Sequence, residues 1–141
     1  MYQLESVPEL QIPLVNKFYK QCRYSAKAVR GDVVYVLKGR EGIVAAVRLE
    51  PKADGWYFLR AMCVAPEVRG QGVGSQLLLG LSDFLQHHPC YCYPFDHLQA
   101  FYQQAGFTWR DPEQAPAFMR DAFERYTRQG RKIILMARLP S

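Results

Sequence analysis

The stretch MCVAPEVRGQGVGSQLL, residues 62–78, decides the fold of this chain. Its apolar first part is typical of a strand, Pro66 ends that strand, and glycines follow at positions 70, 72 and 74. An apolar pattern with helical spacing then begins. A strand, turn and helix in this order expose several backbone N–H groups at a helix N-terminus, where the helix dipole favours phosphate oxygens. Together with the positive charge of Arg69, the stretch predicts a phosphate-binding turn.

The common phosphate-binding motifs do not match this turn. The dinucleotide fingerprint is G-x-G-x-x-G, whereas the spacing here is G-x-G-x-G, and no Gly-Lys-Ser/Thr follows as a P-loop requires. Glycine is needed where a side chain would block a pyrophosphate or where φ is positive. The glycines alone are equally consistent with a tight turn that binds nothing, so the wider sequence has to decide.

Upstream of the turn, the pattern favours an antiparallel meander. Apolar runs alternate with Gly-rich turns, and the pair Asp54-Gly55 favours a tight hairpin. Residues 8–19 have helical spacing, and Pro13 inside them predicts a break or two short helices. The expected strands are residues 4–7, 32–38, 43–49 and 56–64.

Downstream of the turn, helices alternate with strands. Asp96 is expected to cap a helix that Gly106 ends. A helix between two neighbouring strands implies a parallel crossover. We therefore predict an α/β (α+β) fold, with a mixed, mostly antiparallel central sheet of six or seven strands and helices on both faces. The expected helices are residues 72–86, 96–105 and 113–128, and the expected strands are residues 90–93 and 132–138.

The composition fits one globular domain spanning residues 1–141. Hydrophobic residues make up 49% and charged residues 22% of the chain, which is ordinary for a folded protein. No apolar run approaches the roughly 18 residues that a membrane span needs, and the first residues lack the basic and apolar regions of a signal peptide. We therefore expect a cytoplasmic protein with no membrane partner.

The net charge of +5 suits either a nucleic-acid surface or a polyanionic cofactor. The basic residues are scattered and no nucleic-acid motif is present, so we expect no nucleic-acid partner. Cys90 and Cys92 have C-x-C spacing, which differs from the usual zinc spacing, even though His87 and His88 lie close by. We expect reduced, mostly buried thiols and no metal.

Two motifs together resemble those of the GNAT superfamily of N-acetyltransferases. The first is V-A-P-x-x-R-G-x-G-x-G, residues 64–74, which resembles the acetyl-CoA motif of that family. The second is F-Y-Q-Q-A-G-F, residues 101–107, which resembles the later F-Y-x-x-x-G-F helix. They occur in the family's order, and the resemblance covers about residues 30 to 110. It implies acetyl-CoA as co-substrate, held between splayed strands at residues 56–64 and 90–93.

The resemblance also implies which residues hold the cofactor. Backbone groups at the end of the strand pair with the pantetheine arm and the acetyl carbonyl, and the N–H groups of the turn hold the pyrophosphate. Ser75 adds a hydroxyl contact at the start of the helix. The implied cofactor contacts are Met62, Cys63, Val64, Arg69, Gly70, Gln71, Gly72, Val73, Gly74 and Ser75.

The implied reaction is direct attack of a neutral amine on the thioester. It needs a deprotonated amine, a donor for the developing oxyanion and a proton for the leaving thiolate. The backbone N–H of Val64 is the candidate oxyanion donor. Tyr102 matches the family's tyrosine near the thiolate and is the candidate general acid, since a phenol with a pKa of about 10 is a suitable proton source. The alternative is that Tyr102 is a core aromatic beside Leu98, Phe101 and Ala105.

The general base is not identified by the sequence. Many relatives carry a glutamate on the strand before the turn, but residues 59–62, Leu-Arg-Ala-Met, contain no acid. Asp96, His97, Glu50 or a water chain are possible replacements. The thiol of Cys63 lies at the implied acyl site, but no histidine at strand or helical spacing would activate it, so we interpret it as a small apolar strand residue.

Three hypotheses for function follow, in decreasing order of support. The first is an N-acetyltransferase acting on a primary amine of an unidentified small molecule or protein. The second is a non-catalytic acyl-CoA-binding or regulatory domain, and the third a basic nucleic-acid-binding module. Aromatic side chains in residues 14–28 and 109–131 are candidates for the acceptor pocket or for core or dimer contacts, so a homodimer is possible. These aromatic residues are Phe18, Tyr19, Tyr24, Trp109, Phe118 and Tyr126.

Overall fold

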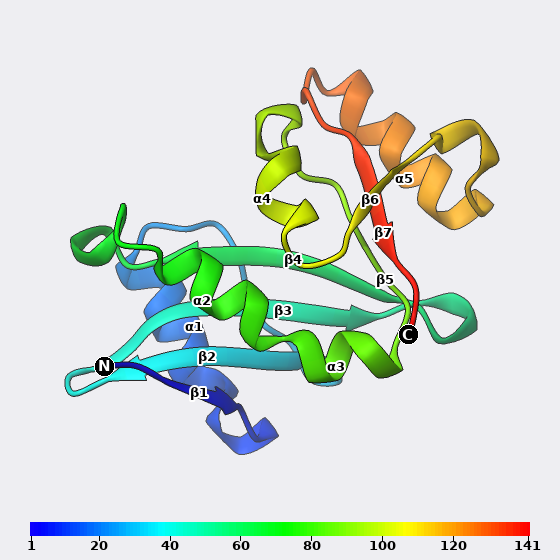
Figure 1. The fold of residues 1–141 in the computed structure, drawn as a ribbon. Helices are drawn as coiled ribbons and strands as arrows, with labels where there is room; N and C mark the ends of the chain where they lie inside the picture. Colours follow the sequence, from blue (N-terminus) through cyan, green and yellow to red (C-terminus); the bar gives the residue numbers. More distant parts are fainter. The chain divides into compact units, whose positions relative to one another are not determined.

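The computed structural model describes residues 1–141 and contains a sheet of seven strands with helices packed against it (Figure 1). The chain divides into two compact units. The first comprises Met1–Pro51 and Phe58–Leu81, and the second comprises Lys52–Tyr57 and Ser82–Ser141. The predicted mixed, mostly antiparallel sheet is confirmed. One domain over the whole chain, a homodimer and a cytoplasmic location stay predictions.

The first unit is built on the predicted meander. β1 pairs antiparallel with β2, and β2 pairs antiparallel with β3, with a register shift between Leu37 and Lys38. β4 follows β3 in the strand order, and the Ala65 N–H just after it donates to the Val44 carbonyl of β3 at 2.8 Å. The strands are β1 (Gln3–Ser6), β2 (Val33–Gly39), β3 (Gly42–Pro51) and β4 (Tyr57–Val64).

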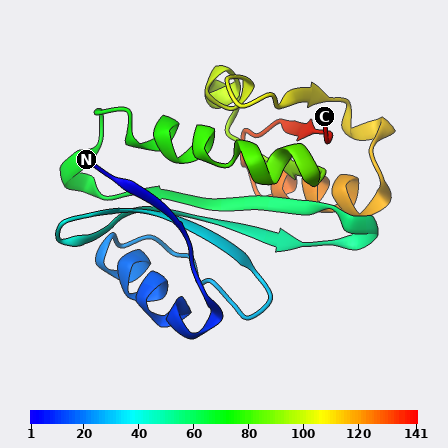
Figure 2. The same ribbon diagram turned by 60° about the horizontal axis from the view of Figure 1, so that its bottom comes forward.

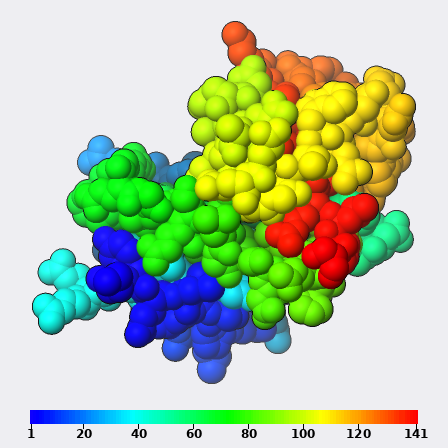
Figure 3. All heavy atoms as spheres, viewed as in Figure 1, coloured from blue at the N-terminus to red at the C-terminus, as the bar shows by residue number.

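Helices cover both faces of these strands. Figures 1 and 2 show α1 on one face and α2 on the other, and the chain leading into α2 lies at the surface, green in Figure 3. The predicted break near Pro13 is confirmed, because a short 3-10 helix ends at Gln11 and α1 begins at Ile12. The helical elements of this unit are η1 (Glu9–Gln11), α1 (Ile12–Gln21), η3 (Pro66–Val68) and α2 (Val73–Gly80).

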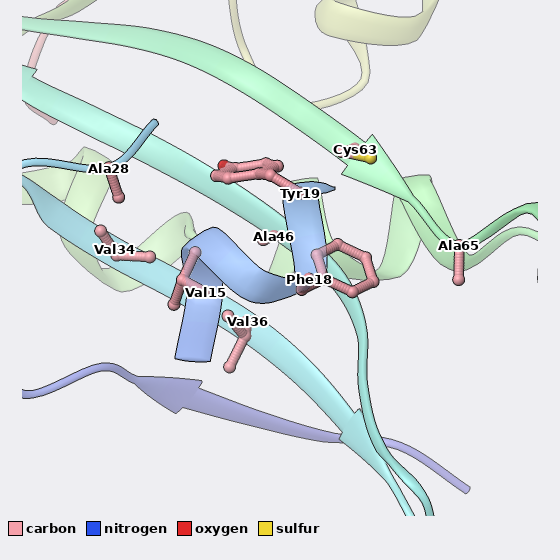
Figure 4. Close-up of a cluster of buried hydrophobic side chains, with 9 residues drawn as sticks. All are labelled: Val15, Phe18, Tyr19, Ala28, Val34, Val36, Ala46, Cys63 and Ala65. Carbon is pink, nitrogen blue, oxygen red and sulfur yellow. The ribbon is translucent and has the colours of Figure 1, made fainter. Parts of the chain in front are cut away.

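The core of the first unit lies between α1 and the strands. Its α1 side consists of Val15, Phe18 and Tyr19, which are at most 5% exposed. Figure 4 shows these side chains against β2 and β3, with Cys63 on β4. α1 is therefore fixed against the sheet by a continuous apolar contact. The full cluster is Val15, Phe18, Tyr19, Ala28, Val34, Val36, Ala46, Cys63 and Ala65.

The second unit has a three-stranded part in the order β5-β7-β6, in which β7 pairs antiparallel with both neighbours. Aromatic rings pack around it: Tyr91 contacts Trp56 and Phe118, and Tyr93 contacts Tyr126. Its elements are η2 (Ala53–Gly55), α3 (Ser82–His87), β5 (Cys90–Cys92), η4 (Asp96–Leu98), α4 (Gln99–Gln103), β6 (Thr108–Arg110), η5 (Pro112–Gln114), α5 (Ala117–Arg128) and β7 (Leu135–Arg138).

Three predictions of local structure were wrong. The expected single helix over residues 72–86 is interrupted, since α2 ends at Gly80 and α3 begins at Ser82. Asp96 is not the cap of the following helix, because it lies inside η4 and α4 begins at Gln99. The helix expected over 113–128 is also divided, into η5 and α5. Glycine lowers helix propensity at the first of these breaks, and Pro116 accounts for the last.

No helix is long and apolar enough to cross a membrane. All four cysteines are free thiols, and three of them, Cys63, Cys90 and Cys92, are buried. No group of three or more His, Cys, Asp or Glu side chains is arranged to hold a metal ion.

Candidate functional site

The second half of β4 contains an unusual backbone conformation. Ala61 has a φ of 58°, in the left-handed region that residues other than glycine rarely adopt. The Tyr19 hydroxyl donates to the Ala61 carbonyl oxygen at 2.8 Å. The backbone of the next three residues, Met62, Cys63 and Val64, is what the family resemblance assigns to the pantetheine and the acetyl carbonyl. The left-handed residue therefore changes the local direction of the backbone of β4 just before these three residues.

The turn after β4 requires glycine at two positions. Gly70 and Gly72 have φ values of 79° and 77°, which glycine adopts without steric cost. Gly72 is the N-cap residue of α2. The first hydrogen bond of that helix runs from the Gln76 N–H to the Gly72 carbonyl, so the N–H groups of Val73 and Gly74 precede it.

The space over this turn is open. A Cβ atom built on Gly70 or on Gly72 would meet no other atom within 4 Å. Crowding by the fold is therefore not the reason for glycine here, in contrast to Gly39, where a Cβ would lie 3.1 Å from the Tyr2 ring. The side of the turn to which these Cβ atoms would point is therefore open at the start of α2.

Arg69 links the strand to the turn. Its Nε donates to the Val64 carbonyl oxygen at 3.1 Å, and the contact is exposed. The guanidinium thus stays beside both the end of β4 and the first glycine of the turn. It places a positive charge beside the end of β4, which favours the approach of an anion.

Cys63 has the properties of a structural thiol. It is 3% exposed. Burial raises its pKa to about 12, the neighbouring Cys22 adds to the increase, and Arg69 opposes it. Because the thiolate is the nucleophilic form, such a thiol is unreactive at neutral pH. This supports its interpretation as a strand residue rather than a nucleophile.

Tyr102 lies on α4 in the second unit. It is 8% exposed, and its ring centroid lies 5.0 Å from that of Phe101 and 6.0 Å from that of Phe107. α4 is followed by Gly106, whose φ is 87°, as the F-Y-x-x-x-G-F pattern predicts. Val64 belongs to the first unit and Tyr102 to the second, so their meeting at one reaction centre stays a prediction.

A model of the family described as "Acetyltransferase (GNAT) domain" matches residues 30–109, which is more than half of the chain. The chain belongs to the GNAT acetyltransferase family. Both motifs of the sequence analysis fall within the matched residues, and the resemblance to this family is thereby confirmed. No curated protein matches the sequence.

Solved structures share the GNAT fold. The ribosomal-protein-S18-alanine N-acetyltransferase from Escherichia coli is 17% identical with a TM-score of 0.67, and the match covers 99% of this chain and 94% of that one. Escherichia coli ElaA is 18% identical with a TM-score of 0.68, over 98% and 99% of the two chains.

A third solved structure contains coenzyme A. N-acetylglutamate synthase from Neisseria gonorrhoeae, complexed with coenzyme A and N-acetyl-glutamate, is 14% identical with a TM-score of 0.67. The match covers 98% of this chain but 35% of the synthase, so this chain spans about a third of that protein. At such low sequence identities, these structural similarities show a common fold and nothing further.

The candidates for a general base in this GNAT chain differ in their surroundings. Glu50 lies on β3 in the first unit, with its side chain 25% exposed, and its Oε1 accepts from Arg60 Nη1 of β4 at 3.0 Å. Asp96 and His97 lie in η4 of the second unit, with side chains 61% and 72% exposed. Only Glu50 therefore belongs to the same unit as Met62–Val64.

The two segments with candidate aromatic residues, residues 14–28 and 109–131, also belong to different units. In the first unit, Tyr24 stacks on Tyr19 at 5.8 Å, and burial raises its pKa, with Cys63 adding to the increase and Arg60 opposing it. In the second unit, the Phe118 ring of α5 packs edge-on against Tyr91, while Trp109 is 53% exposed. Within the first unit, Tyr24 is thus the aromatic residue of residues 14–28 that lies near the Cys63 thiol and is partly open to solvent.

Sequence reasoning missed two features of this site. It did not identify the left-handed Ala61, because alanine has no preference for that conformation. It also identified no partner for the Tyr19 hydroxyl. Tyr19 was left as a candidate for pocket, core or dimer contacts, and it is fully buried and hydrogen-bonded to β4. A tyrosine among the apolar residues of a helix was the one available signal, since its hydroxyl needs a partner when buried.

Proposed function

We propose that this GNAT domain binds acetyl-CoA at the end of β4 and at the turn before α2, and transfers the acetyl group to a primary amine. The observation that carries the proposal is the pair of left-handed glycines, Gly70 and Gly72, with open space above them at a helix N-terminus. The coenzyme A in the Neisseria gonorrhoeae synthase of the same fold adds support.

The cofactor would be held mainly by backbone groups. The N–H groups of residues 69–74 and the Ser75 hydroxyl would bind the pyrophosphate, which the α2 dipole and Arg69 favour electrostatically. Backbone groups of Met62, Cys63 and Val64 would pair with the pantetheine and the acetyl carbonyl. Backbone recognition explains why the motif is set by glycines and by strand direction rather than by reactive side chains.

The chemistry would be a direct transfer. The neutral amine attacks the thioester carbonyl, a C–N bond forms and the C–S bond breaks, which releases CoA. The Val64 N–H donates to the developing oxyanion. Tyr102 gives its proton to the leaving thiolate and is reprotonated through solvent. A base removes the proton of the attacking amine, and Glu50 is the candidate that the first unit offers.

A second candidate function is a non-catalytic acyl-CoA-binding domain. The observation that favours it is the composition of β4, where residues 59–62 have no carboxylate. Burial of Tyr102 beside Phe101 and Phe107 also suits a purely structural aromatic. A shared fold does not establish activity, so the distinction is experimental.

The test is release of free thiol from acetyl-CoA across a panel of amines, with a polyamine, free amino acids and peptides with different N-terminal residues. We expect one acetylated amine for each CoA released, and Tyr102→Phe to lower kcat by about 10²–10⁴-fold with little change in the acetyl-CoA Kd. Binding without turnover of any amine would favour the second candidate. No binding by the folded protein would reject both.

A further inference from the structure

Ala61 in β4 is the only residue other than glycine that has a positive φ within a strand. Ala61, Arg23 and Asp54 are the residues other than glycine with positive φ. Arg23 follows the end of α1 and Asp54 lies in η2. For an alanine this conformation is sterically unfavourable, so it persists only where the surrounding structure holds it.

Tyr19 provides that restraint. Its side chain lies on α1, is completely buried, and reaches toward β4, the strand that carries Cys63 (Figure 4). The hydroxyl donates to the Ala61 carbonyl at 2.8 Å. If β4 were regular at Ala61, this carbonyl would point elsewhere and the buried hydroxyl would lose its partner, which is unfavourable. The hydrogen bond and the left-handed backbone therefore depend on each other.

The Tyr19 hydroxyl remains a hydrogen-bond donor well above neutral pH, because burial raises its pKa. Burial raises the pKa of the Tyr19 hydroxyl far above its ordinary value, and the positive charge of Arg48 opposes this only in part. The hydroxyl thus stays protonated and remains a donor. The Tyr19 ring is itself fixed by the stacked ring of Tyr24 at 5.8 Å.

The position of α1 is fixed as well. Asn16 of α1 exchanges two hydrogen bonds with the Ala28 backbone, at 3.0 Å and 2.7 Å. The loop that contains Ala28 is held by the buried ion pair between Asp32 and Arg48 at 2.7 Å. The donor atom of Tyr19 therefore has a defined position relative to β4.

We propose that Tyr19 is a positioning residue for acetyl-CoA. Its hydroxyl holds Ala61 in the left-handed conformation and so fixes the backbone direction of Met62–Val64, to which the cofactor binds. The inference rests on the proposed function, because it assigns a role to Tyr19 only if this backbone receives acetyl-CoA. The plain alternative is a core tyrosine whose hydroxyl merely finds a partner.

The test is a double-mutant cycle of Tyr19→Phe and Ala61→Gly, with the acetyl-CoA Kd measured by calorimetry. Tyr19→Phe removes the hydroxyl and keeps the ring, and we expect the Kd to rise about 5- to 10-fold, as for the loss of one buried hydrogen bond. Glycine adopts positive φ without help. In the Ala61→Gly background, the same Tyr19→Phe change should therefore raise the Kd less than about 3-fold.

Val36→Ala is the control for a general loss of stability. Val36 is completely buried in the same cluster but lies on β2, and its truncation should lower stability without changing the acetyl-CoA Kd. Equal effects of Tyr19→Phe in both backgrounds, or no effect in either, would overturn the positioning role. Failure of the wild-type protein to bind acetyl-CoA would instead overturn the proposed function itself.

Discussion

Gly72→Ala separates backbone strain from loss of cofactor binding, because the chain contains a matched control in Gly55. The φ values of Gly72 and Gly55 are 77° and 79°, and a Cβ built on either would meet nothing within 4 Å. Neither alanine would clash with the fold, so the penalty comes from φ alone. For an alanine held in the left-handed region this amounts to about 1–2 kcal/mol.

The two variants should therefore lose similar stability and differ in binding. We expect urea unfolding to show a loss of about 1–2 kcal/mol for each. At Gly72 the added methyl group also enters the open space over the first turn of α2, where the pyrophosphate is proposed to lie. A loss of about 1.4 kcal/mol or more in binding free energy there corresponds to at least a tenfold rise in the acetyl-CoA Kd.

Calorimetric titration of both variants with acetyl-CoA measures the difference. We expect Gly55→Ala, in the η2 turn, to bind acetyl-CoA as the wild type does. Equal Kd values for the two variants would refute the assignment of the turn as the pyrophosphate site. A much larger loss of stability at Gly72 than at Gly55 would refute the reasoning that strain is the only structural effect.

Further predictions concern the buried ion pair and the buried thiol. Asp32→Ala should cost about 3 kcal/mol of unfolding free energy, because it leaves Arg48, whose side chain is 9% exposed, without its 2.7 Å partner. Glu9→Ala, which breaks the exposed pair with Arg30, should cost almost nothing by the same urea assay, and similar losses for both would contradict the difference in burial. Since burial raises the pKa of Cys63 to about 12, iodoacetamide at pH 8 should leave it unmodified in the folded protein but label it in urea, as peptide mass spectrometry would detect. Because the folded state keeps this proton at pH values where the unfolded thiol has lost it, stability should fall as the pH rises from about 9, the ordinary value of a thiol, towards 12. Rapid labelling of Cys63 at pH 8 without urea would show that the thiol is accessible and activated.

The parts of the fold with strong local signals could be predicted from the sequence. The β2, β3 and β4 strands follow from apolar runs separated by Gly-rich turns, and the strand–turn–helix at residues 62–78 follows from Pro66 and three alternating glycines. These signals are local, because each depends on the conformational preferences of a few neighbouring residues. The same stretch contains the proposed pyrophosphate site. This part of the proposed acetyl-CoA site could therefore be predicted from the sequence.

The features that were missed depend on contacts between distant residues. The left-handed Ala61 is held by Tyr19, which lies 42 residues earlier in the chain, and no pattern around Ala61 indicates it. The strand β6 has only three residues and is defined by its pairing with β7. The break between α2 and α3 follows Gly80, which packs against Leu4 of β1, whereas the apolar spacing of the sequence continues through it.

The most direct test of cofactor binding is calorimetric titration of the wild-type protein with acetyl-CoA and, separately, with S-acetylpantetheine, which has the same thioester but no pyrophosphate. We predict saturable binding of acetyl-CoA at one site and a Kd for S-acetylpantetheine at least about 100-fold higher, because the second ligand cannot reach the N–H groups of the α2 turn. Equal affinity for the two ligands would contradict the role of the turn, and no binding of acetyl-CoA by the folded protein would contradict the acetyltransferase proposal as a whole.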